Sequence, residues 1–170
     1  MYYAIQESNS INRAHLKYFG AGMDDIEKNA AKMQLEGLLD TLTDAKEYGS
    51  ILNVESVQLG AAAPVCGSRR YRRSDQYGQR GAWKKPAEQL NGFIDIGETM
   101  ARKYWVTVTN PPYLNAKNLQ QNVVSYINDY FPLTKNDFFT VFIEKGLDYL
   151  IPNGLISMIT QQAWMFQIEL

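Results

Sequence analysis

The sequence predicts an α/β fold, in which short apolar strands alternate with amphipathic helices. Two apolar stretches of strand length, 106–109 and 155–160, flank a segment in which apolar residues recur every three or four positions, as on one face of a helix. All residues of the first stretch are β-branched, which favours a strand buried on both faces. The 170 residues suffice for one domain with an apolar core.

The first segment, residues 1–54, is predicted to contain a strand and a helix. Residues 2–5 are apolar and lead into a polar turn over residues 6–10. A helix is predicted from Asp24 to Tyr48, because acidic residues at its start favour the positive end of the helix dipole and Gly49 suits its end. The residues expected on its packing face are Ile26, Ala30, Met33, Gly37, Leu38, Leu42 and Ala45.

The middle segment, residues 55–88, has no hydrophobic periodicity and is predicted to be an irregular loop. Its cations could hold nucleic-acid phosphates, since aromatic residues interleave with them. A solvated loop without function, or a stretch translated out of frame, explains the same composition, and these two alternatives are preferred to DNA binding. The cations are Arg69, Arg70, Arg72, Arg73, Arg80, Lys84 and Lys85.

The last segment, residues 89–170, has the most regular pattern. Its predicted elements are, in order, a helix over 90–101, the strand 106–109, a short helix over 119–130, a helix over 138–151 and the strand 155–160. Thr134 or Asn136 is expected to cap the longer of the last two helices, and Pro152-Asn153-Gly154 to end it.

Composition narrows the classes of function. The net charge of −1 gives no general sign of a nucleic-acid partner. The single cysteine, Cys66, excludes an internal disulfide and fits a cytoplasmic location. The sequence contains no apolar run long enough to span a bilayer, so no membrane partner is expected. His15 has no neighbours at metal-ligand spacing, and no metal is expected.

The residues Asn110-Pro111-Pro112-Tyr113 end the first strand and have a chemistry of their own. The strand must stop because Pro111 has no N–H, and Pro112 keeps the chain stiff. The Asn110 side-chain oxygen and the Pro111 carbonyl can each accept an N–H of one amino group, which frees its nitrogen lone pair for attack. The Tyr113 ring can stack on a planar base, worth roughly 1–3 kcal/mol. The alternative is an ordinary Pro-Pro turn in which Tyr113 only packs.

The tetrapeptide resembles the catalytic motif of amino-group methyltransferases that use S-adenosylmethionine. Residues 137–145, 153–160 and 163–166 are similar to the large bacterial adenine-specific DNA methyltransferases, notably those of BREX phage-defence systems and of fused restriction–modification enzymes. The similarity covers the last part of the chain well and residues 1–54 more loosely. Protein-glutamine and RNA methyltransferases share the tetrapeptide alone, so they remain alternatives. The family usually carries an aspartate where this chain has Trp105.

The resemblance implies a partial Rossmann-like sheet with flanking helices, S-adenosylmethionine as the methyl donor and double-stranded DNA as the partner. It implies catalytic roles for Asn110, Pro111, Pro112 and Tyr113. It implies cofactor contacts for Glu7, Ser8 and Asp137. Contacts with the target base or a phosphate are implied for Tyr113, Lys117 and Phe138. Plain structural roles, namely a solvated loop, a helix cap or core packing, compete for every residue outside the tetrapeptide.

One part of the family pattern is missing from the sequence. The family holds its cofactor with a glycine-rich strand–turn–helix upstream of the tetrapeptide, and residues 64–68 echo this motif only superficially. The chain is therefore expected to be a fragment that needs the rest of a longer polypeptide and is inactive alone. An inactive gene remnant is the non-enzyme alternative, and the DNA recognition sequence cannot be predicted.

Overall fold

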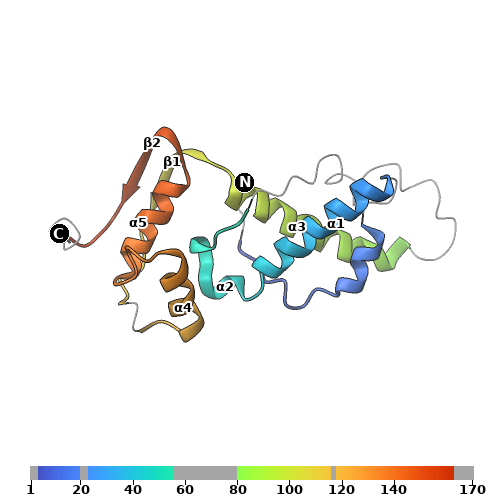
Figure 1. Ribbon diagram of the computed structural model, residues 1–170, viewed down its shortest axis with the longest axis horizontal. Helices are drawn as coiled ribbons and strands as arrows, with labels where there is room; N and C mark the ends of the chain where they lie inside the picture. Colours follow the sequence, from blue (N-terminus) through green and yellow to red (C-terminus); the bar gives the residue numbers. More distant parts are fainter. Residues whose placement is uncertain (1–3, 20–22, 56–79, 116–117, 163–170) are drawn as a thin grey trace. The chain divides into compact units, whose positions relative to one another are not determined.

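The computed structural model describes residues 4–19, 23–55, 80–115 and 118–162 (Figure 1). The side chains of residues 15, 17, 18 and 80–87 are not described. The chain divides into two compact units, residues 1–101 and 102–170. The predicted contact residue Lys117 and the basic cluster up to Arg73 lie outside the described residues.

The first unit is helical. Its elements are the 3₁₀ helix η1 (Arg13–Tyr18), α1 (Asp25–Thr41), α2 (Ala45–Tyr48), the 3₁₀ helix η2 (Gly49–Ile51) and α3 (Arg80–Ala101). Helices α1 and α3 pack closely, because a Cβ added at Gly97 of α3 would lie 2.7 Å from the Leu38 side chain of α1. The apolar core of this unit includes Leu35, Leu39 and Phe93.

The ends of the first long helix follow local side-chain chemistry. Asp24 caps α1, and its carboxylate accepts the Glu27 N–H at 2.7 Å, which confirms the predicted start. The predicted single helix is interrupted between α1 and α2, because Asp44 adopts a left-handed conformation with φ 53°. Gly49 ends α2 with φ 61°, as its freedom at positive φ allows.

The packing face predicted for the helix from Asp24 to Tyr48 is only half right. Leu38, Leu42 and Ala45 are buried as expected, but Ile26 is 82% exposed and Met33 73% exposed. The buried stripe of α1 is Ala31, Leu35, Leu38 and Leu39. The predicted residues that are exposed form a second stripe, which is offset from the buried one by one residue, or about 100° around the helix. Both stripes have helical spacing. The pattern of spacing therefore could not decide which stripe meets α3.

Two further predictions for the first unit need correction. Of the strand predicted over residues 2–5, Ala4 and Ile5 are described, and neither pairs with another strand. Helix α3 begins at Arg80, inside the segment predicted to be an irregular loop. The later part of α3 is confirmed, with Leu90, Phe93 and Ile94 buried at the predicted helical spacing.

The second unit is an α/β structure built on two parallel strands. Its elements are β1 (Tyr104–Thr109), α4 (Gln121–Tyr130), α5 (Phe138–Asp148) and β2 (Leu150–Met158). Strands β1 and β2 pair in parallel, with Val106 opposite Leu155 and Thr109 opposite Met158. The motif 110–113 therefore begins at the carboxyl end of a paired strand.

Helix α5 covers one face of this sheet. A Cβ added at Gly146 of α5 would lie 2.7 Å from the Ile156 side chain of β2, so the glycine permits a close approach. On the other face Val106 and Leu155 are exposed, and Val108 is 73% exposed. The prediction that this strand is buried on both faces is wrong for the described residues, because α5 packs on one face only.

The boundary between α5 and β2 also differs from the prediction. The Tyr104 N–H donates to the Tyr149 carbonyl at 2.7 Å, and Tyr104 pairs with Leu150. Leu150 thus belongs to β2 and not to the helix. The strand register shifts between the pairs Tyr104–Leu150 and Val106–Leu155. Asn153, which lies within this shift, has a φ of 64°. The N-cap of α5 is Asp137, whereas Thr134 or Asn136 was expected.

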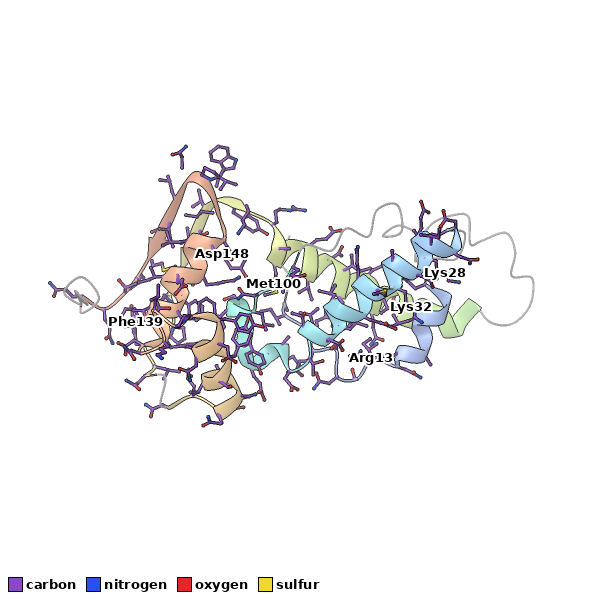
Figure 2. The ribbon with its side chains drawn as sticks, viewed as in Figure 1. Arg13, Lys28, Lys32, Met100, Phe139 and Asp148 are labelled. Carbon is purple, nitrogen blue, oxygen red and sulfur yellow. The ribbon has the colours of Figure 1, made fainter. Side chains whose placement is uncertain are left out.

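A buried lysine lies at the carboxyl end of α5, where Figure 2 labels Asp148. Lys145 is only 5% exposed; its ammonium lies 3.0 Å from Asp148 and 4.7 Å from the centre of the Tyr149 ring. Lys103 binds the other Asp148 oxygen at 2.8 Å. The hydrogen bond from Lys103, and then that from Lys145, holds the pKa of Asp148 below its usual range. Burial, with Asp148 nearby, raises the pKa of Tyr149 far above its usual range.

Asp148→Asn is expected to destabilise the second unit by about 1–2 kcal/mol, because the buried Lys145 ammonium loses its carboxylate partner. Lys103→Met is the matched control and is expected to cost less than about 1 kcal/mol, since that lysine is exposed. Urea unfolding followed by circular dichroism measures both. Equal losses in the two variants would contradict a special role for the buried lysine.

The Asp148 carboxylate and its two lysine partners predict the effect of acid. Because the hydrogen bond from Lys103, and then that from Lys145, makes the pKa of Asp148 lower in the folded chain than its ordinary 3.8, the stability that these contacts contribute is fully present above pH 3.8. That contribution is lost as the pH falls from 3.8 through the lower folded pKa. The Asp148→Asn variant should lack this part of the acid dependence.

The described residues contain neither a membrane-spanning helix nor a metal-binding cluster. None of the described helices is both long and apolar enough to cross a membrane. The same part of the chain contains no cluster of three or more His, Cys, Asp or Glu side chains that could hold a metal ion.

Candidate active site

The motif Asn110-Pro111-Pro112-Tyr113 leaves the sheet directly after its last paired residue. The Ile159 N–H, just past β2, donates to the Thr109 carbonyl at 3.4 Å, so pairing continues up to the motif. Pro111 is fully buried, while the Asn110 side chain is exposed. The backbone of the motif is therefore held at its second residue, and the amide group of its first residue is accessible to a ligand.

The Tyr113 side chain is held at two points. Its ring packs edge to face with that of Phe139 in the first turn of α5, with ring centres 6.3 Å apart and planes at 70°. Its hydroxyl donates to the Ile159 carbonyl at 2.8 Å. The side chain is still 44% exposed, so part of the ring remains open to a ligand.

The loop after the motif is joined to the start of α5. The Phe138 N–H donates to the Leu114 carbonyl at 3.0 Å, and Asn115 forms an antiparallel bridge with Asp137. These backbone contacts bring the predicted site residues Asp137 and Phe138 beside the motif. The loop after the motif and the start of α5 therefore lie side by side in the fold.

Within this junction the side chains have different surroundings. Asp137 is half-buried, and its carboxylate makes no capping hydrogen bond and has no ionic partner among the described residues. It could accept a hydrogen bond from an amino group of a ligand. The Phe138 ring packs against Phe142, with centres 5.2 Å apart, in the core. The ring that contacts Tyr113 is Phe139, which lies in the helix predicted over 138–151 but was not among the predicted site residues.

Comparison with known proteins decides the family. Residues 17–169 match the Eco57I restriction-modification methylases. The chain belongs to this family.

Two curated relatives of this methylase chain have names that specify the base. It is 29% identical over 139 residues to the adenine-specific methyltransferase PglX of Lacticaseibacillus casei (strain Zhang), covering 78% of this chain and 11% of the relative. It is 29% identical over 128 residues to the adenine-specific methyltransferase BrxX of Escherichia coli O9:H4 (strain HS), covering 75% of this chain and 10% of the relative. The chain spans about a tenth of the length of these relatives, and the resemblance inferred from the sequence is confirmed.

The other predicted site residues of this Eco57I-family chain belong to the first unit. Ser8 is buried, its hydroxyl donates to the Leu39 carbonyl, and its N–H donates to the Leu42 carbonyl at 3.1 Å. Glu7 forms an ion pair with Lys46 at 3.4 Å. Local contacts thus account for the polar groups of both residues, and their contact with a cofactor stays a prediction.

The described residues fit the acceptor side of a methylase site better than the donor side. Asn110 and Tyr113 present an amide oxygen and a ring at the carboxyl edge of the sheet, where α/β proteins bind ligands. No strand in the described part of the chain leads through a glycine-rich turn into a helix. The edge thus presents a hydrogen-bond acceptor and a ring face that a ligand could contact.

Proposed function

We propose that this chain forms part of the catalytic domain of a DNA adenine N6-methyltransferase with a Rossmann-like sheet. The observation that carries the proposal is the geometry of the motif, in which an exposed Asn110 and a Tyr113 ring held against Phe139 lie on either side of a buried Pro111. Family membership and the adenine-specific relatives support DNA adenine as the substrate. The proposed partners are double-stranded DNA and the rest of a longer polypeptide.

The motif would orient the amino group of an adenine flipped out of the duplex. The Asn110 side-chain oxygen and the Pro111 carbonyl would each accept one N–H of that group, which directs the nitrogen lone pair outward. Tyr113 would stack on the base, and Pro112 would limit movement of the loop. S-adenosylmethionine, when bound, would supply a methyl group activated on a sulfonium. The contribution of this chain is positioning, and the proposed route needs no metal.

Five further residues are proposed to contact the cofactor or the DNA. The Asp137 carboxylate, which has no ionic partner among the described residues, would accept a hydrogen bond from the cofactor, with Glu7 and Ser8 as further contacts. Phe138 would border the base pocket, and Lys117 would meet a phosphate.

The test of this function is methyl transfer by the complete polypeptide that carries these residues. Tritiated S-adenosylmethionine is supplied with unmethylated genomic DNA, RNA or a glutamine-containing protein fraction in parallel reactions. We expect label in DNA, recovered as N6-methyladenine after hydrolysis. Label in RNA or in glutamine side chains alone would contradict the DNA assignment and favour the alternatives that share the tetrapeptide.

Replacing Tyr113 should separate stacking from hydrogen bonding. Tyr113→Ala should weaken DNA binding at the target base by roughly 10- to 100-fold, since it removes the stacking surface. Tyr113→Phe keeps the ring and loses only the bond to the Ile159 carbonyl, so a loss of less than about tenfold is expected. The measured quantity is KM for DNA. Equal losses in the two variants would show that the hydroxyl, and not the ring, is needed.

A further inference from the structure

The Tyr113 ring is fixed before any ligand is present. Its hydroxyl is bound to the Ile159 carbonyl at one end, and its ring contacts Phe139 at 6.3 Å. Phe139 itself is 2% exposed and lies in the first turn of α5 (Figure 2). The two partners come from different segments, one just past β2 and one in a helix, so the side chain cannot change rotamer without breaking these contacts.

Such fixation matters for a side chain that stacks on a base. A loop tyrosine free to change rotamer would lose that freedom when a base binds, and binding would be weaker by that entropy. A ring already held in one orientation loses little. The backbone bridge between Asn115 and Asp137 ties the motif loop to the same end of α5, so loop and supporting ring are held together.

We infer that Phe139 is a positioning residue for the methyltransferase site, acting through the Tyr113 ring and not by contact with the base. The inference rests on the proposed function, because it assigns Tyr113 to base stacking. Phe138 provides a natural comparison. It is the adjacent residue, of the same type and also buried, but its ring packs against Phe142 and not against Tyr113.

The contact is tested first without any assay of activity. In the 170-residue chain labelled with 3-fluorotyrosine, the Tyr113 ¹⁹F signal is identified by its loss in Tyr113→Phe. Phe139→Leu should shift and narrow this signal, because the neighbouring ring is gone and the tyrosine ring turns faster. Phe138→Leu should leave it unchanged. An unchanged Tyr113 signal in Phe139→Leu would overturn the inference.

The consequence for catalysis is tested in the complete polypeptide with unmethylated genomic DNA. Phe139→Leu should raise KM for DNA roughly five- to tenfold with a smaller change in kcat, and Phe139→Tyr should restore KM because it keeps a ring in place.

The outcomes separate this inference from the proposed function. If Tyr113→Ala raises KM and Phe139→Leu does not, the positioning role is wrong and the stacking role stands. If Phe139→Leu and Phe139→Tyr lose activity equally, the residue has a general packing role and the inference fails. If Tyr113→Ala leaves KM unchanged, base stacking by this tyrosine fails, and the positioning role fails with it.

Discussion

Asn110→Ala is expected to lower methyl transfer by the complete polypeptide roughly 10²- to 10³-fold, the loss found when one preorganised hydrogen-bond partner of a reacting group is removed. The substitution deletes one of the two acceptors that would orient the adenine amino group, and the Pro111 carbonyl alone cannot fix its direction. Because the Asn110 side chain is exposed, unfolding free energy should change by less than about 0.5 kcal/mol.

The measurement is single-turnover methylation of DNA, which isolates the chemical step from product release. Asn118→Ala is the matched control, since this asparagine is also exposed and lies in the loop after the motif. It should retain the parental rate. Asn110→Asp keeps an oxygen acceptor and should retain more activity than Asn110→Ala. A parental rate for Asn110→Ala would contradict the catalytic assignment.

The 170-residue chain by itself is expected to show neither DNA methylation nor measurable binding of S-adenosylmethionine. The motif orients an acceptor amine, but rate depends on holding that amine in line with the methyl group. The described residues contain no glycine-rich turn before a helix that could bring backbone N–H groups close to a cofactor. An element that would hold the methyl donor is thus absent from the described residues.

Calorimetric titration with S-adenosylmethionine and a methyl-transfer assay on duplex DNA test both parts of this prediction. The complete polypeptide serves as the positive control in each measurement. Micromolar binding by the chain would reveal a cofactor site among residues that make local contacts in this structure, with Glu7 and Ser8 the first to replace. Turnover by the chain would contradict the expectation that it is a fragment.

The strand β1 and its motif could be predicted from sequence because local chemistry determines them. Four β-branched residues favour a strand, and Pro111 ends it whatever lies nearby. The cap at Asp24 and the stop at Gly49 were predictable for the same reason. The family assignment also followed, since the residues that carry it lie close together in the chain.

Burial could not be predicted in the same way, because it depends on neighbours far along the chain. Val108 looks like a core residue, yet α5 covers only the opposite face of its sheet. Leu150 continues the apolar spacing of α5, but pairing with Tyr104 places it in β2. Phe139 could not be told from its neighbour Phe138 by type or spacing, and only the fold shows which ring meets Tyr113.

Both polar backbone groups of Ile159 serve the motif, while its side chain points largely into solvent. The N–H bonds to Thr109 and the carbonyl accepts from the Tyr113 hydroxyl. Position 159 could therefore mutate to almost any amino acid over evolution and still hold the tyrosine, with proline excluded for want of an N–H. A position whose backbone alone is used need not keep one amino acid in a family of sequences, although the geometry of the site depends on that backbone.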